Sequence, residues 1–219
     1  LTRNLVDGNK EQSVAVAETT LGEGVDPVLF FEECLAHSLE RIGNMFDELE
    51  IFLPELLSAA ENAQAINDEV ITPAVQASSM GETRTSGKVI LATVKADLHD
   101  IGKNMVALML RVNGFEVVDL GIDVDSSAII EAAEREDADI IGLSCLLTTC
   151  LSYMRDTAEI LNDLGIRDQY HLIVGGAAPT HDFAKEIGAD SYGESAADAV
   201  TICKELLRSA HKSHSEVLT

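Results

Sequence analysis

The chain has 219 residues, 46% of them hydrophobic, which is enough to fill the cores of two domains. It carries 38 acidic and 15 basic residues and a formal net charge of −23, so we expect no nucleic-acid partner. No apolar run reaches the roughly 18 residues that span a bilayer, and the amino end is polar. The four cysteines are far apart in sequence, as is usual for isolated thiols in a reducing compartment. We therefore expect a cytoplasmic protein with no membrane segment.

Residues 1–86 have helical spacing throughout and predict a small helical bundle. Asp26 and Pro27 match an N-cap followed by a proline at the first helical position. Pro54 can open a further helix in the same way. The stretch 78–87 is small, polar and without periodicity, so it is expected to be a linker to a second domain at 88–219.

From Lys88 the pattern changes to alternating strands and helices. Apolar runs predict strands at 89–94, 115–120, 139–144, 171–174 and 190–192. Amphipathic segments predict helices at 103–113, 126–135, 152–164, 182–187 and 196–209. Five such units predict an α/β fold with a doubly wound, five-stranded parallel sheet in the flavodoxin-like (Rossmann-like) strand order.

Ligands of open parallel sheets bind beyond the carboxyl ends of the strands, where the strand order reverses. In this sequence the segments at that edge are 95–102, 144–148, 175–177 and 193–195. The first of them places His99 between Asp97 and Asp100. A carboxylate two residues away can accept a hydrogen bond from Nδ1–H of a histidine, which fixes the tautomer and directs Nε2 outward, as in metal-bound histidines. On these residues alone, a capping or solvent-exposed histidine is equally open.

His99 is the only histidine expected on this rim, and Cys145 and Cys150 cannot complete the three or four ligands of a structural zinc site. One histidine suffices if the metal arrives in a macrocycle, as in haem or a corrinoid. A phosphate site fits poorly, because the two aspartates would repel phosphate and no glycine-rich turn opens the first helix. A phosphoryl-accepting receiver domain has this fold, but it needs an aspartate where the third strand ends at Ser144.

Three motifs carry a resemblance to a known family: Asp97-x-His99-x-x-Gly102, Ser144-x-Leu146 and Gly175-Gly176. In this order, and on these loops, they resemble the cobalamin-binding domain shared by methionine synthase and the corrinoid proteins of methyltransferase systems. In the helical half, 43–46 and 51–55 resemble the helical cap that precedes that domain. The resemblance covers about residues 15–209.

The resemblance implies that His99 replaces the benzimidazole of the cofactor as the lower ligand to cobalt, and that Asp97 hydrogen-bonds to His99 and relays a proton. It also implies a deep channel for the displaced nucleotide tail and an apolar cover over the upper face of the corrin. The implied cofactor-binding residues are Asp97, Leu98, His99, Asp100, Ile101, Gly102, Ser144, Leu146, Thr148, Gly175, Gly176, Ala177 and Ser195 in the α/β half, and Phe46 and Leu53 in the cap.

The sequence departs from the family pattern at two positions. The family usually has a glycine between the residues matching Phe46 and Pro54, where this chain has Leu49. Methionine synthase extends its relay to a hydroxyl at the position of Cys150, and a thiol is a weaker hydrogen-bond partner. The turn between the two cap helices and the third member of the relay are therefore expected to differ.

The resemblance implies a corrinoid protein that carries a methyl group on cobalt, as methylcobalamin and cob(I)alamin, and is not catalytic alone. Its implied partners are a substrate-specific methyltransferase, a second methyltransferase that passes the methyl group to an acceptor such as tetrahydrofolate or a thiol, and a reductive activator. The alternatives are the cobalamin-binding subunit of a radical mutase and a cobalamin-dependent sensor. A sensor would need a basic DNA-binding module, which the tails of this chain do not provide.

Overall fold

The computed structural model describes residues 1–78 and 87–216. Contacts between Cα atoms divide the chain into two compact units, Leu1–Met80 and Gly81–Thr219. The expected linker at 78–87 lies almost entirely outside the described residues. Within those residues, no helix is both long and apolar enough to cross a membrane.

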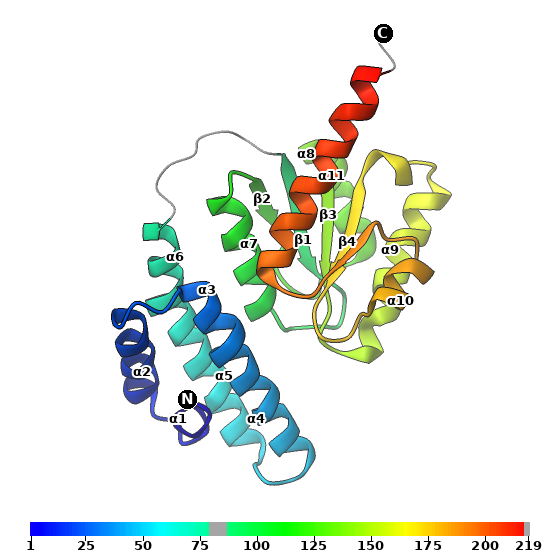
Figure 1. The fold of residues 1–219 in the computed structure, drawn as a ribbon. Helices are drawn as coiled ribbons and strands as arrows, with labels where there is room; N and C mark the ends of the chain where they lie inside the picture. The colour runs from blue at the N-terminus through cyan, green and yellow to red at the C-terminus, as the bar shows by residue number, and fades with distance from the viewer. Residues whose placement is uncertain (79–86, 217–219) are drawn as a thin grey trace. The chain divides into compact units, whose positions relative to one another are not determined.

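The first unit is helical, as the sequence predicts (Figure 1). Asp26 Oδ1 accepts the N–H groups of Val28 and Leu29 at 2.9 and 3.0 Å, which confirms the predicted cap. Glu55 caps the start of the helix that begins at Leu53, because its carboxylate accepts a hydrogen bond from the N–H of Phe52 at 2.9 Å. The elements of the unit are α1 (Thr2–Val6), α2 (Lys10–Gly22), α3 (Pro27–Phe30), the π-helical turn η1 (Phe31–Ala36), α4 (His37–Asp47), α5 (Leu53–Ile66), the π-helical turn η2 (Asn67–Ile71) and α6 (Thr72–Ser78).

The core of the helical unit draws side chains from both its short and its long helical segments. Its largest fully buried side chains are Leu5, Phe30, Leu35, Ile42, Ile66 and Ile71. Burying such side chains contributes about 1.5–3 kcal/mol each relative to leaving them in water. Several apolar residues of the turn between α4 and α5 are instead exposed, namely Leu49, Phe52 and Leu53.

Leu49 lies in the α4–α5 turn with a φ of 61°, in the left-handed region. Its side chain is 75% exposed, so no packing compensates for this conformation. The turn therefore keeps a backbone conformation that favours glycine, although the side chain there is leucine. Leucine in place of the usual glycine thus leaves the turn with backbone strain at Leu49.

Replacing Leu49 by glycine is expected to stabilise the helical unit by about 1 kcal/mol, because a left-handed residue with a Cβ atom costs roughly 1–2 kcal/mol. The free energy of unfolding from urea denaturation, followed by circular dichroism, measures the gain. Glu48→Gly is the matched control, since Glu48 has a φ of −81° and offers no strain to relieve. A Leu49→Gly protein that is no more stable than the parent would contradict this account.

The second unit is a five-stranded parallel sheet in the order β2-β1-β3-β4-β5, the flavodoxin-like order that the sequence predicts. Each strand is followed by a helix, and the ends of most elements differ from the predicted ends by one or two residues. The strands are β1 (Lys88–Thr93), β2 (Glu116–Asp119), β3 (Ile140–Ser144), β4 (His171–Gly175) and β5 (Ser191–Gly193). The helices are α7 (Ile101–Val112), α8 (Ser126–Glu136), α9 (Leu151–Asp163), α10 (His181–Glu186) and α11 (Ala196–Glu216), with 3-10 turns η3 (Thr148–Cys150) and η4 (Arg167–Gln169).

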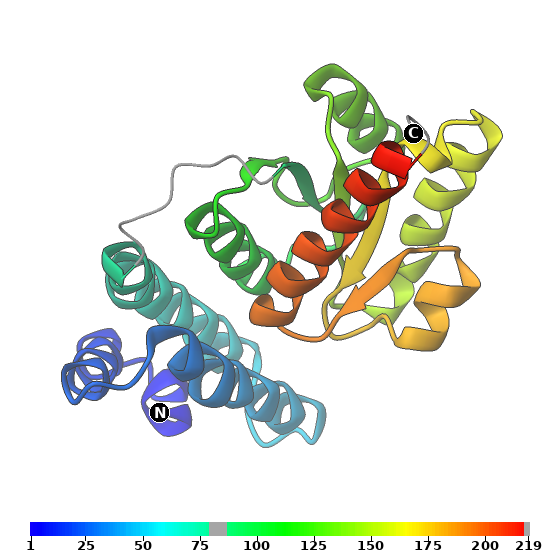
Figure 2. The same cartoon turned by 45° about the horizontal axis from the view of Figure 1, so that its top comes forward.

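The helices cover the two faces of the sheet in two groups. Alternate residues of β1 separate the groups: Ile90 packs with α8 and α9, whereas Val89 packs with α7 and α11. Figures 1 and 2 show α7 and α11 side by side across one face. The chain after β1 therefore crosses to one face and the chain after β3 to the other. The strand order reverses between these two strands, which is where ligands of open parallel sheets bind.

Candidate functional site

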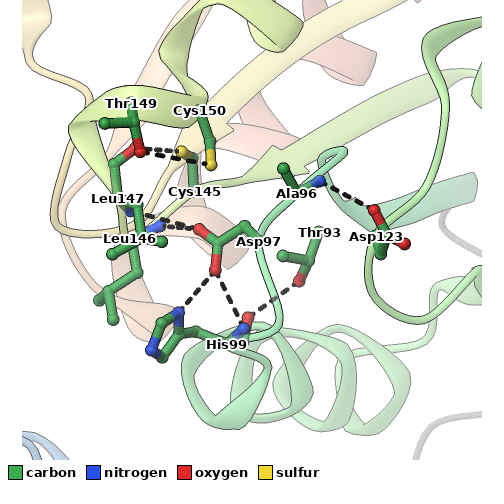
Figure 3. Close-up of polar contacts among 10 residues, drawn as sticks. All are labelled: Thr93, Ala96, Asp97, His99, Asp123, Cys145, Leu146, Leu147, Thr149 and Cys150. Carbon is green, nitrogen blue, oxygen red and sulfur yellow. Dashed lines mark hydrogen bonds and ion pairs between the residues drawn. The ribbon is translucent and has the colours of Figure 1, made fainter.

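The loops that follow β1 and β3 meet at one buried carboxylate (Figure 3). Asp97 is completely buried. Its Oδ1 accepts two hydrogen bonds from His99, one from the ring nitrogen Nδ1 at 2.6 Å and one from the backbone N–H at 3.0 Å. Its Oδ2 accepts the backbone N–H of Leu146 at 2.6 Å and that of Leu147 at 3.3 Å. Asp97 therefore joins the histidine to the loop after β3.

Burial alone would raise the pKa of Asp97, but the hydrogen bonds from Leu146, His99 and Leu147 outweigh burial and hold the pKa below its usual value of 3.8. Asp97 is therefore a charged acceptor at neutral pH. An ionised carboxylate accepts only, so Nδ1 of His99 carries the hydrogen. The lone pair of the neutral ring is then on Nε2, and the side chain is 51% exposed. The Nε2 lone pair of an imidazole oriented in this way is the donor that metal-bound histidines use.

A second loop supports the backbone that leads into Asp97. Ala96 has a φ of 66° and Asp123, in the loop after β2, has a φ of 55°. Ala96 N–H donates to Asp123 Oδ1 at 2.9 Å, and Asp123 N–H donates to the Asp97 carbonyl at 3.0 Å. Two left-handed residues therefore hold each other in place beside the site. Sequence reasoning missed Asp123, since no motif marks it.

The Asp97 carboxylate lies close enough to the thiol of Cys145 to affect its pKa. Burial first, and the nearby Asp97 carboxylate second, raise the pKa of Cys145 to about 12. Its Sγ donates to the Leu147 carbonyl at 3.1 Å. The Sγ of Cys150 is buried 3.8 Å from the Thr149 hydroxyl. Cys145 therefore stays protonated at neutral pH, so its thiol packs beside the Asp97 carboxylate without adding a second negative charge.

The structure places the other predicted residues of the α/β unit on or next to these loops. Leu98, Leu146 and Leu147 are exposed apolar residues at the edge, at 65%, 43% and 40% exposure. Ser144 ends β3, Thr148 begins η3, and Asp100, Ile101 and Gly102 form the start of α7. Ser195 accepts the N–H of Asp198 at 3.1 Å at the start of α11.

The loop after β4 passes so close to the loop after β3 that only glycine fits. Gly176 has a φ of 104°, and a Cβ atom there would lie 2.3 Å from the Cys145 carbonyl oxygen. A Cβ at Gly175 would lie 3.2 Å from the Gly193 carbonyl oxygen. A Cβ at Gly102, in contrast, would meet no atom within 4 Å. Gly176 thus allows the loops after β3 and β4 to approach closely, and Gly175 pairs with Gly193 where β4 and β5 end, whereas Gly102 faces open space. Ala177 follows directly in the same loop.

Phe46 and Leu53 belong to the helical unit. Phe46 is partly buried near the end of α4, and Leu53 is 56% exposed at the start of α5. Leu53 is therefore not a core residue of its unit.

The expectation that His99 is the only histidine on the rim is wrong. His181 begins α10 directly after the loop that follows β4, so it lies at the same edge of the sheet. Its Nε2 is 3.6 Å from Glu194, which follows β5, and its ring packs edge-on against Tyr192. Its place in sequence, just before an amphipathic helix, could have indicated this position. His181 lacks the buried carboxylate that orients His99.

Across the described parts of the chain, no three His, Cys, Asp or Glu side chains form a group that could hold a metal ion. A bare cation would find too few ligands at the rim. A metal that brings its own equatorial ligands in a macrocycle needs only one axial nitrogen, which His99 offers. The donor set therefore fits a corrinoid or haem and not a structural ion.

Comparison with protein families decides between these macrocycles. A family model described as a B12 binding domain matches residues 87–201, and a second model with the same description matches residues 1–69. The chain belongs to the B12-binding family. Its cofactor is accordingly cobalamin, and the fold is the cobalamin-binding α/β domain preceded by a helical cap.

Known proteins resemble this chain along nearly its whole length. Trimethylamine corrinoid protein 1 of Methanosarcina acetivorans is 40% identical, and the match covers 93% of each chain. The structure of the monomethylamine corrinoid protein of Methanosarcina barkeri is 29% identical with a TM-score of 0.85, covering 94% of this chain and 95% of that one. A chain of the methanol:cobalamin methyltransferase complex of the same organism is 28% identical with a TM-score of 0.55, covering 94% and 78%. These B12-binding relatives are corrinoid proteins of methyltransferase systems.

Asp97→Asn is expected to destabilise the α/β unit by about 2–3 kcal/mol at pH 7, because hydrogen bonds to charged groups contribute about 1.5–3 kcal/mol and an amide group cannot accept on both sides. The pKa of Asp97 is lowered by folding, so its contribution is present above 3.8 and is lost as the pH falls through and below this value. Urea denaturation at several pH values measures the difference from the parent, which should narrow in acid. Asp156→Asn, at an exposed carboxylate of α9, is the control for the change in charge. A constant difference down to acid pH would contradict the assigned charge.

Proposed function

We propose that the chain is a methyl carrier that binds cobalamin in the base-off form, with Nε2 of His99 as the lower ligand to cobalt. The observation that supports this most directly is the 2.6 Å hydrogen bond between the buried Asp97 carboxylate and Nδ1 of His99, whose side chain is half-exposed. The bond orients the ring and increases its basicity, as carboxylate partners of metal-bound histidines do. The cofactor supplies the chemistry of methyl transfer, and the chain supplies the ligand, its orientation and the surroundings.

The remaining rim residues are proposed to hold the displaced nucleotide tail of the cofactor. Gly175, at the end of β4, and Gly176, in the loop that follows, leave backbone rather than side chains beside this path. Ser144, Thr148 and Ser195 offer hydroxyl groups along it, and Gly102 leaves room at the start of α7. The exposed Leu98, Leu146 and Leu147 provide apolar surface for the lower face of the corrin.

The proposed partners are methyltransferases. Several relatives of this chain, at up to 40% identity, are named for methylated amines, which favours a methylated amine as the methyl donor of the first partner. A second methyltransferase would pass the methyl group to an acceptor such as tetrahydrofolate or a thiol, and a reductive activator would restore oxidised cofactor. Similarity along nearly the full length to carriers favours this function over a mutase subunit or a sensor.

His99→Ala is expected to abolish nitrogen coordination from the protein while the chain stays folded, because the exposed ring is not part of the core. Electron paramagnetic resonance of the protein loaded with Co(II) cobalamin measures this as the loss of nitrogen superhyperfine splitting. His181→Ala is the matched control, since His181 lies at the same edge without an orienting carboxylate, and it should keep the splitting. Splitting that survives in His99→Ala, or is lost in His181→Ala, would refute the ligand assignment.

We also propose that Phe46 and Leu53 shield the upper face of the bound corrin. Leu53 is 56% exposed although it is apolar, as expected of a residue that contacts a ligand and not its own core. Leu53→Ala is therefore expected to speed photolysis of the methylated protein while its melting temperature without cofactor stays close to that of the parent. Leu164→Ala, at an equally exposed leucine that follows α9, is the control and should change neither quantity. Unchanged photolysis in Leu53→Ala would contradict the shielding role.

A further inference from the structure

The backbone of residue 99 is held on both sides of its Cα atom. On the amino side, the His99 N–H donates to Asp97 Oδ1 at 3.0 Å. On the carboxyl side, the His99 carbonyl accepts the hydroxyl of Thr93 at 3.0 Å (Figure 3). Asp97 contacts both the N–H and the ring through the same oxygen, so it supplies a single anchor point. The Thr93 hydroxyl supplies a second anchor point and thereby restricts rotation of the residue about the first.

Thr93 is itself rigidly placed. It is the last residue of β1 and is completely buried. Its N–H donates to the Gly121 carbonyl at 2.9 Å, and its carbonyl accepts the N–H of Val124 at 3.1 Å. In the sheet it is paired with Ser144 at the end of β3. The hydroxyl that contacts residue 99 therefore projects from the sheet and not from a loop.

An ion pair between a buried lysine and a partly buried aspartate fixes the turn that contacts Thr93. Asp119 lies at the end of β2. Its Oδ1 accepts hydrogen bonds from the N–H of Gly121 at 2.9 Å and from Nζ of Lys103 at 2.6 Å. The Lys103 side chain is 2% exposed and comes from the first turns of α7, directly after the His99 segment. The bonds thus form a closed path from α7 through Asp119, Gly121 and Thr93 back to His99.

We propose that Thr93 is a positioning residue for His99, and that its hydroxyl fixes the direction in which Nε2 is presented to cobalt. This inference rests on the proposed role of His99 as the cobalt ligand. Thr93 does not touch the cofactor in this proposal, because it is buried and acts only through the carbonyl of residue 99. Its loss should weaken the bond from His99 to cobalt without displacing the fold.

Thr93→Val removes the donor and keeps the shape of the side chain, whereas Thr93→Ser restores a hydroxyl. Thr157→Val is the matched control: Thr157 is also completely buried in the α/β unit, and its hydroxyl lies 2.9 Å from the Tyr153 carbonyl. Two readouts separate positioning from general stability. The first is amide hydrogen exchange of residues 97–101 in the protein without cofactor. The second is the ratio of His-on to His-off cobalamin from the Co(II) paramagnetic resonance spectrum.

Thr93→Val is expected to speed exchange at residues 97–101 and to lower the His-on ratio about tenfold, the lower end of the range for changes around metal-bound histidines. Thr93→Ser should return both readouts close to the parent, and Thr157→Val should change neither. An unchanged His-on ratio in Thr93→Val, with splitting lost in His99→Ala, would overturn the positioning role alone. Splitting that persists in His99→Ala would overturn the ligand assignment and this inference with it. Equal changes in Thr93→Val and Thr157→Val would reduce the effect to general destabilisation and also overturn the inference.

Discussion

The site depends on one buried negative charge. Removing a carboxylate from water is costly unless hydrogen bonds replace the lost solvation, and Asp97 receives four, three of them from backbone N–H groups. Because two of these N–H groups belong to Leu146 and Leu147, the loop after β3 must close onto the loop after β1 for the charge to be tolerated. The same bonds keep the pKa of Asp97 low, so the charge that requires this closure is also the charge that orients His99.

The sheet explains why these loops meet. Strands β1 and β3 are neighbours, with Thr93 paired to Ser144 at their carboxyl ends. The helices that follow them cover opposite faces, so neither of these two helices lies over the carboxyl ends of the pair. The loop after β4 packs against the loop after β3 so closely at Gly176 that only glycine fits there. Rigid strands therefore hold a group of irregular loops, and the proposed ligand lies at the point where the strand order reverses.

Much of this architecture could be predicted from the sequence. Short apolar runs and a periodicity of 3.6 distinguish the strands and helices from Lys88 onward, and the connection rules then favour the observed strand order. Asp97 and His99 could be paired in advance because they are two residues apart. The contacts of Asp97 with Leu146 and Leu147 could not, since they join its carboxylate to backbone N–H groups about fifty residues away, which almost any residue type would offer. The same is true of the Thr93 hydroxyl, whose partner is a carbonyl, and of Leu49, whose left-handed backbone contradicts its residue type. The position of His181 could not be predicted from a motif, because it depends on where α10 begins after β4.

The central claim is that Asp97 fixes His99 in the Nδ1–H tautomer, with Nε2 free for cobalt, before any cofactor binds. Nitrogen-15 NMR of the histidine rings in the cofactor-free protein tests this directly, at a pH where the His99 ring is neutral. The account predicts a protonated Nδ1 and an unprotonated Nε2 for His99, and a loss of this preference in Asp97→Asn. A His99 ring that is protonated on Nε2, or that exchanges freely between both tautomers in the parent protein, would contradict it.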